Sequence, residues 1–135
     1  MINRLADSLD FNSQALMLRS ERQRLLASNI ANADTPGYVA RDMDFAAALR
    51  QATGTSAAGS VAVAALGLPR GFGLAAETTL RFAAPSQSNL DGNSVDMDRE
   101  RASFADNSIK YEATLRFINS QVRSMLDAMK SPQQG

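Results

Sequence analysis

The sequence predicts a mainly α-helical protein whose long N- and C-terminal helices form an antiparallel coiled-coil hairpin. Three observations predict this fold: residues 2–32 contain no glycine or proline, residues 97–130 carry apolar side chains at heptad spacing, and an Ala/Gly-rich segment separates them. At about 1.5 Å per residue the two helices are roughly 45 and 50 Å long, so they are well matched for pairing. The predicted division is 1–33 (N-terminal helix), 34–51 (turn and extended segment), 52–93 (flexible variable middle) and 94–135 (C-terminal helix and tail).

The N-terminal helix carries two apolar stripes at spacings built from steps of three and four residues. The first stripe consists of Leu5, Leu9, Leu16, Leu26 and Ile30, and the second of Phe11, Ala15, Leu18 and Leu25. Two adjacent stripes make an apolar face wider than a two-stranded coiled coil buries. We therefore expect this helix to have more than one apolar neighbour.

A strong stop signal follows at residues 32–38. Pro36 has no N–H to donate and pushes Thr35 out of the helical region. Pro36 and Gly37 fit the two central positions of a type II turn, in which the glycine takes a positive φ. Asp34 is expected to accept hydrogen bonds from backbone N–H groups beyond it. An extended segment from Tyr38 and a short helix from 45 to 51 are predicted next.

The middle of the chain is rich in small residues, and the stretch from 52 to 60 has the composition of a linker. Within it, residues 77–83 are predicted to form a strand, and we expect a short β-hairpin in this otherwise irregular segment. A turn is predicted at 89–93.

The C-terminal helix is predicted to begin after Asp96, a good N-cap, and to end before Pro132. Its apolar residues recur at alternating steps of four and three from Met97 to Met129, interrupted by Arg101 and Ser108. This heptad pattern indicates a coiled-coil seam. Six residues of the pattern are predicted to form an assembly seam: Phe104, Tyr111, Leu115, Ile118, Val122 and Met125.

Composition excludes several classes of function. The chain has no cysteine and no histidine, so it lacks a thiol nucleophile and the commonest general base and metal ligand. Its 14 basic and 14 acidic residues balance, which gives no electrostatic footprint for nucleic acid. No apolar stretch is long enough to span a bilayer, and no cleavable secretory signal is visible. We predict no enzyme activity, no catalytic, cofactor-binding or metal-binding residue, and no small-molecule substrate.

Residues 26–38 match a known family pattern. They resemble the signature of the bacterial flagellar basal-body rod proteins, and the continuation at 40–45 is most similar to the proximal-rod subunits. Residues 92–98 and 105–111 resemble the same family's C-terminal region. The signature residues are Leu26, Ala27, Ser28, Asn29, Ile30, Ala31, Asn32, Asp34, Thr35, Pro36, Gly37 and Tyr38.

The resemblance implies a structural subunit of the proximal rod, whose terminal helices assemble into a torque-transmitting shaft around the export channel. It implies a place in the periplasmic rod of the flagellar basal body, reached through the flagellar type III export apparatus without a cleaved signal. The partners it implies are other rod subunits, MS-ring and export-gate proteins, and the rod–ring junction protein.

Some alternatives stay open at this point. A soluble coiled-coil adaptor or a flagellar export chaperone would also carry such helices. Asn29 and Asn32 lie on one helix face, and their amides either satisfy the end of their own helix or bond a neighbouring subunit. The Pro36–Gly37 turn is hypothesised to fix the angle at which the chain leaves the helix and docks on a neighbour.

Overall fold

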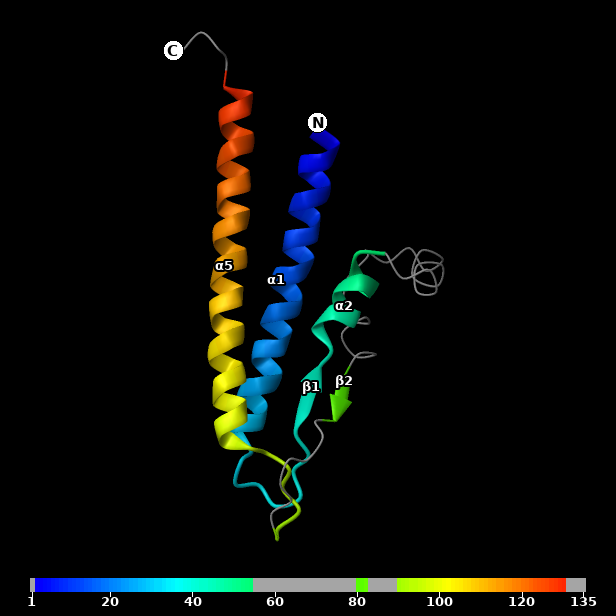
Figure 1. Cartoon of the computed structure of the whole chain (residues 1–135), viewed down its shortest axis with the longest axis vertical. Helices are drawn as coiled ribbons and strands as arrows, with labels where there is room; N and C mark the ends of the chain where they lie inside the picture. Colours follow the sequence, from blue (N-terminus) through cyan, green and yellow to red (C-terminus); the bar gives the residue numbers. More distant parts are fainter. Residues whose placement is uncertain (1, 55–79, 83–89, 131–135) are drawn as a thin grey trace.

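The structure is a computed structural model that describes residues 2–54, 80–82 and 90–130 (Figure 1). Two long helices, α1 (Ile2–Ala31) and α5 (Met97–Met129), stand side by side and confirm the predicted terminal helices. Near the end of α5, Gln121 bonds Asn12 in the first half of α1. At the start of α5, Glu100 bonds Asn29 near the end of α1. The two helices therefore run in opposite directions.

The start of α5 follows from local chemistry. The Asp96 carboxylate accepts a hydrogen bond from the Arg99 backbone N–H at 3.2 Å, so the predicted N-cap is confirmed. Asp98 and Glu100 lie in the first turn, where the helix dipole favours negative charge. The Glu100 side chain, however, is buried, and its surroundings are described below.

Two short strands join segments that are distant in sequence. β1 (Arg41–Met43) pairs antiparallel with β2 (Leu80–Phe82), and Asp42 lies opposite Arg81. The prediction of a β-hairpin within the middle segment is wrong for the described strand, because the partner of β2 lies before that segment. The rest of the predicted strand at 77–83 lies outside the described residues. Strand composition revealed β2, but pairing with a non-local partner leaves no local signal.

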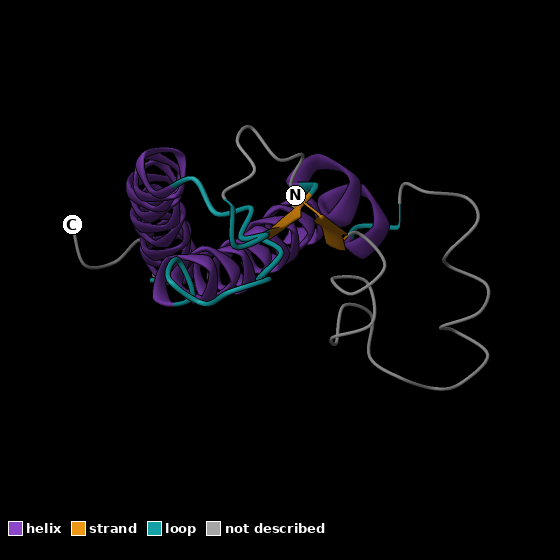
Figure 2. Cartoon of the chain, turned by 90° about the horizontal axis from the view of Figure 1, so that it is seen from below, coloured by secondary structure: helices purple, strands orange, loops and turns teal. Residues whose placement is uncertain are grey.

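The short helix α2 (Phe45–Ala52) confirms the helix predicted at 45–51. It begins because the Asp44 carboxylate caps it, accepting from the Ala47 N–H at 3.0 Å. α2 packs on α1, and α1 lies between α5 and α2 (Figure 2). The apolar core is formed there by Leu18, Leu25, Met43 and Ala48, with Phe45, Leu49 and Ala52 packed around them.

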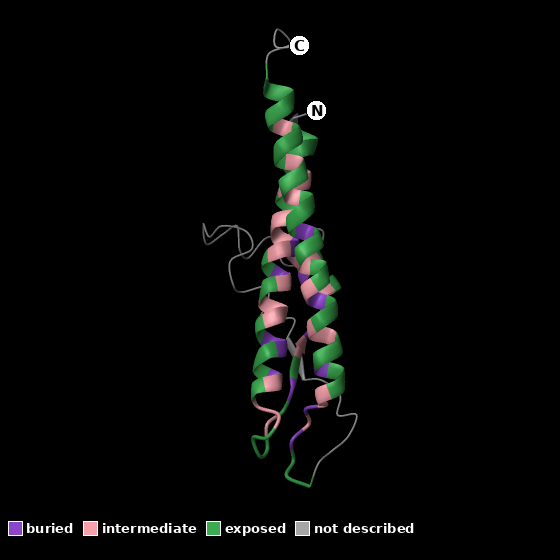
Figure 3. Ribbon diagram, turned by 90° about the vertical axis from the view of Figure 1, so that its left-hand side faces the viewer, coloured by how far each residue is buried: buried purple, intermediate pink, exposed green. Residues whose placement is uncertain are grey.

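Burial is uneven along the two long helices (Figure 3). All of their buried residues lie between 15 and 29 on α1 and between 100 and 114 on α5. Residues 3–14 and 115–130 contain only exposed and intermediate positions. The end of the hairpin next to the turn, here called the base, is therefore well packed, whereas the opposite end, the tip, is not. Among the described residues, none of the helices is both long and apolar enough to cross a bilayer.

Candidate assembly interface

The turn at the base has the geometry that the sequence predicts. The Tyr38 N–H donates to the Thr35 carbonyl at 3.2 Å, and Gly37 adopts a φ of +72° between them. These are the features of a type II turn with Pro36 and Gly37 at its centre. The prediction that Asp34 accepts hydrogen bonds from the following backbone N–H groups is wrong. Within the described part of the chain, hydrogen bonds between other residues hold this turn.

Asn93, on the segment that leads into α5, holds the turn from outside. Its side chain is fully buried, and its Nδ2 group donates to the carbonyls at the end of α1 and in the turn, those of Asn32, Ala33 and Thr35, at 3.0, 2.8 and 2.8 Å. The Asn93 Oδ1 atom accepts from the Val95 N–H at 2.8 Å. A helix leaves its last carbonyls without partners, so an amide that reaches them from a distant segment acts as a C-cap.

Backbone hydrogen bonds extend this junction on both sides of Asn93. The Gly37 N–H donates to the Asp91 carbonyl at 2.9 Å, and the Ser94 N–H donates to the Tyr38 carbonyl at 3.0 Å. The Ala40 N–H donates to the Ser94 Oγ atom at 2.9 Å. The segment 91–94 thus runs along the segment 37–40 and satisfies its polar groups.

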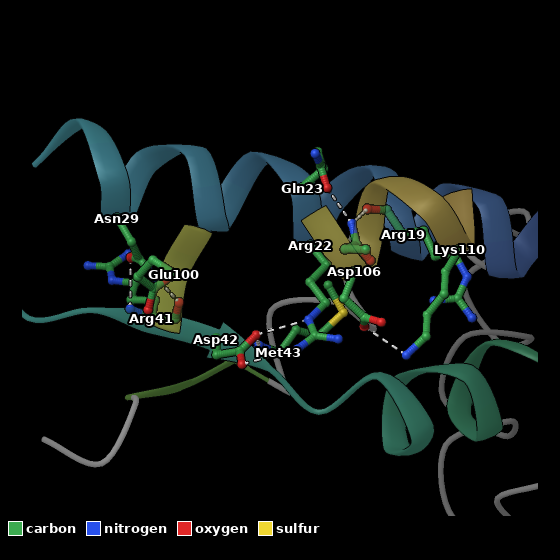
Figure 4. A network of polar contacts seen from close by, with 11 residues as sticks. Arg19, Arg22, Gln23, Asn29, Arg41, Asp42, Met43, Glu100, Asp106 and Lys110 are labelled. Carbon is green, nitrogen blue, oxygen red and sulfur yellow. Dashed lines mark hydrogen bonds and ion pairs between the residues drawn. The ribbon is translucent and has the colours of Figure 1, made fainter. Parts of the chain in front are cut away.

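Asn29 is the second buried amide of the base, and all its polar groups are used (Figure 4). Its Nδ2 group donates to the Arg41 carbonyl at 2.7 Å and to Glu100 Oε2 at 3.0 Å. Its Oδ1 atom accepts from the Arg41 N–H at 3.0 Å and from the Tyr38 hydroxyl at 3.1 Å. One side chain thereby ties α1 to β1, to the turn and to the first turn of α5.

The Glu100 carboxylate is buried beside Asn29, with 6% of the residue exposed. Burial raises the pKa of Glu100; the hydrogen bond from Asn29 opposes that rise, and the nearby Asp42 charge adds to it. Asp42 itself is ion-paired with Arg22 at 3.3 Å. The group that bonds the Glu100 carboxyl is thus the neutral amide of Asn29, while Arg22 pairs with Asp42.

We call the set of Asn29, Tyr38, Asn93 and Glu100, with the backbone groups they bond, the latch. These contacts answer in part whether Asn29 and Asn32 satisfy the end of their own helix or bond a neighbouring subunit. Asn32 satisfies the end of its own helix, because its Nδ2 group donates to the Ser28 carbonyl at 2.8 Å. Asn29 instead makes long-range contacts within the chain, which neither alternative anticipated.

The other signature residues surround the latch. Leu26 is buried, and Ile30 and Asn32 are partly buried. The remainder of the signature before Tyr38 lies at the surface: Ala27, Ser28, Ala31, Asp34, Thr35, Pro36 and Gly37. The signature therefore presents a buried side to its own chain and an exposed side to the outside.

Polar residues continue up the contact between α1 and α5. Asn107 is fully buried and donates to the Arg19 carbonyl at 2.9 Å and to Gln23 Oε1 at 2.6 Å. Near the tip, Gln121 donates to the Ser8 hydroxyl at 2.6 Å and accepts from Asn12 at 3.1 Å. Polar side chains at the centre of a helix pair fix its register and its partner.

These polar residues recur every seven positions on α5. Glu100, Asn107 and Thr114 are buried, and Gln121 continues the series as a half-buried residue. The predicted seam residues lie beside this line of polar residues. Phe104, Tyr111, Ile118 and Met125 are half-buried, whereas Leu115 and Val122 are exposed. An apolar pattern locates apolar positions only, so it missed the polar centre of the contact.

An apolar side of the hairpin stays uncovered. Leu115, Val122 and Leu126, spaced by seven and four residues on α5, are 36%, 39% and 55% exposed. Below them a groove of about 360 Å³ opens between the two helices, lined by Ser20, Gln23, Arg24, Ala27, Phe104, Ser108 and Tyr111. Exposed apolar rows of this kind mark surfaces that bind another protein.

Other large apolar side chains are exposed elsewhere on the two helices. Ile109 and Phe117 are 70% and 65% exposed and lie on other sides of α5, and Phe11 is 47% exposed on α1. One neighbour on one side of the hairpin would leave some of these groups in water. Covering all of these groups would therefore take more than one neighbour.

Comparison with known proteins identifies the family. The sequence model described as "Flagella basal body rod protein" matches residues 9–38. The flagellar basal body rod protein FlgB of Proteus mirabilis (strain HI4320) is 46% identical over 135 residues, which cover 96% of this chain and 98% of that protein. FlgB of Salmonella typhimurium is 44% identical with the same coverage. This chain belongs to the flagellar basal-body rod protein family, among the FlgB proteins.

The relationship extends to more distant FlgB proteins. FlgB of Cereibacter sphaeroides is 40% identical over 124 residues, covering 92% of this chain and 94% of that protein. Members of the FlgB family are structural parts of the flagellar basal-body rod and are not enzymes, and the same holds for this chain. The comparisons give no support to the alternative of a soluble adaptor or an export chaperone.

Sequence reasoning found the signature of the FlgB family but missed the residues that complete it. Asn93, Ser94 and Glu100 bond the signature segment across about 56 to 71 positions. The available signal was the stop at the end of α1, whose free carbonyls must find donors somewhere in the fold. Nothing in the local pattern shows that Asn93 supplies them.

Proposed function

We propose that this chain builds the rod by burying the uncovered apolar side of its α1–α5 hairpin against neighbouring subunits. The observation that carries the proposal is the exposed row of Leu115, Val122 and Leu126 on a chain related to FlgB proteins along almost its whole length. Fully burying one such side chain contributes about 1.5–3 kcal/mol, so a few rows repeated over several neighbours hold a subunit in place. The predicted assembly seam acts here through its exposed members.

The base and the tip of the hairpin have different roles in assembly. The base gives each subunit a fixed shape, because buried polar contacts join α1, β1 and α5 there. The tip supplies apolar side chains that the described parts of the chain leave exposed. Exposed apolar groups on several sides of the helices suit repeated contacts between unlike surfaces, which extend into a helical assembly instead of closing as a dimer.

Partners follow from the family. We propose that other rod subunits cover the apolar side and that MS-ring proteins, export-gate proteins and the rod–ring junction protein contact the ends of the assembly. The assembled helices would pair as coiled coils in the periplasmic rod. Before assembly the tip lacks its neighbours, so the free chain should hold less helix than the assembled one, which suits passage through the type III export apparatus.

Val122→Asp tests the proposal in cells that depend on this protein for swimming. Val122 is exposed and makes no polar contact, so the change should leave the hairpin folded but place a charge where a neighbour packs. We expect loss of rod assembly and of motility at unchanged protein level. Ser120→Asp, on an exposed position of the same helix, is the matched control and should still swim.

Two outcomes would contradict the proposed assembly surface. Normal swimming of the Val122→Asp strain would exclude the apolar row as an assembly surface. Equal loss of swimming in both strains would show that any added charge on α5 is harmful, and the row would then have no special role.

A further inference from the structure

We infer that the latch at the base of the hairpin is stabilised by acid: protonation of the Glu100 carboxyl strengthens the closure of the first turn of α5 on α1 and β1. This inference concerns the single chain and does not depend on the proposed assembly. It follows from how the carboxyl is buried and from what surrounds it.

The geometry leaves the carboxylate poorly compensated. Glu100 is 6% exposed, and its hydrogen-bond partner is the neutral Asn29 Nδ2 group at 3.0 Å. Among the lysines and arginines whose side chains the structure describes, which leaves out residues 80–82, none forms an ion pair with it. A buried charge without a cation is costly, whereas a neutral carboxyl in the same place keeps its carbonyl oxygen for Asn29.

The charged groups around Glu100 do not reverse this balance. On the α1 side, Arg22 is engaged by Asp42 of β1. Asp42 and Asp96 disfavour a further negative charge, and Arg99 favours it. Arg41 of β1 contributes its backbone groups to the latch while the residue itself is exposed (Figure 4).

The sign of the pH dependence follows. Burial raises the pKa of Glu100 above its ordinary value of 4.5, so the folded chain holds this proton at a pH where the unfolded chain has lost it. Folding is therefore favoured as the pH falls, and this contribution is lost as the pH rises through the folded pKa. Glu21 and Asp106 act in the opposite direction, because hydrogen bonds from Arg24 and Lys110 lower their pKa values.

Glu100→Gln isolates the contribution of this one group. Glutamine keeps the oxygen that accepts from Asn29 and removes the charge, so thermal unfolding of the full chain should occur at a higher Tm than wild type at pH 7. The difference should shrink as the pH falls toward 4.5. Glu112→Gln is the control, because Glu112 forms an exposed pair with Arg116. It should not show this convergence with wild type.

A second measurement on the wild-type chain covers the case in which the variant does not fold. Carboxyl carbon NMR of Glu100 should titrate with a midpoint above 4.5, and amide exchange in residues 26–40, corrected for its intrinsic pH dependence, should slow as the pH falls. A midpoint at or below 4.5 would overturn the inference. So would equal pH profiles of the two glutamine variants, or a 26–40 segment without protected amides at any pH.

Discussion

The base and the tip of the hairpin use the same two helices in opposite ways. At the base, buried polar side chains such as Asn29, Asn93 and Glu100 join the elements beside the apolar core. At the tip, the polar contacts between α1 and α5 include the group around Gln121, and large apolar side chains such as Val122 and Leu126 are exposed. The base is completed within the chain, whereas the tip offers surface to others.

One chain can therefore adopt a single specific fold and still offer a binding surface to other chains. Buried polar groups tolerate only the arrangement that satisfies them, so they select one register between α1 and α5. Contacts between apolar side chains are non-directional, so apolar side chains left exposed at one end form an assembly surface. If the whole contact between α1 and α5 were apolar, the hairpin would bury the surface that binds other chains.

The largest expected effect comes from Asn29→Asp, a change of nearly constant shape. A carboxylate cannot donate to Glu100 or to the Arg41 carbonyl, and it places a second negative charge beside Glu100. We expect urea unfolding to show a loss on the order of 3–5 kcal/mol. Asn119→Asp on an exposed position of α5 is the control. A loss below about 1 kcal/mol would mean that the base does not depend on this amide.

A smaller effect is expected for Asn93→Ala, which removes three hydrogen bonds to carbonyls at the end of α1 and in the turn. These carbonyls then lack a donor, although water can reach some of them. We therefore expect the free energy of unfolding to fall by about 1–3 kcal/mol in total. Hydrogen exchange should localise the loss to residues 26–40 and spare the tip. Uniform loss of protection along both helices would contradict the separation into two regions.

The smallest effect is expected at the tip. Gln121→Ala removes the hydrogen bonds to Ser8 and Asn12, which lie among partly exposed groups, so we expect a change of about 0.5–1 kcal/mol in the free energy of unfolding. Differential scanning calorimetry of this variant and of Asn93→Ala measures how much each end of the hairpin contributes to stability. If Gln121→Ala proved the more harmful of the two, the tip would be the region that holds the chain together.

Local chemistry made several elements predictable. Asp96 caps α5, Pro36 and Gly37 form the turn, and α1 continues through a stretch without glycine or proline. Each of these depends on residues within a few positions of one another, where propensity and capping rules apply. The family signature was visible for the same reason, because its residues are contiguous.

Non-local contacts set the limit of that reasoning. The strand β2 has its partner some 40 positions earlier, and Asn93 bonds carbonyls about 60 positions away. The expected seam also shifted, because the line of α5 that meets α1 runs through Glu100, Asn107 and Thr114. Apolar periodicity does not reveal a contact whose centre is polar.

Local patterns and contiguous motifs were enough to predict the two long helices, the turn between α1 and the extended segment, and membership of a family of assembling proteins. The folded structure was needed to show that the segment entering α5 completes the signature, and to show which apolar residues remain in water. The physical reason is that a buried polar group must find its partner wherever the fold brings one, and that pairing is a property of the closed chain.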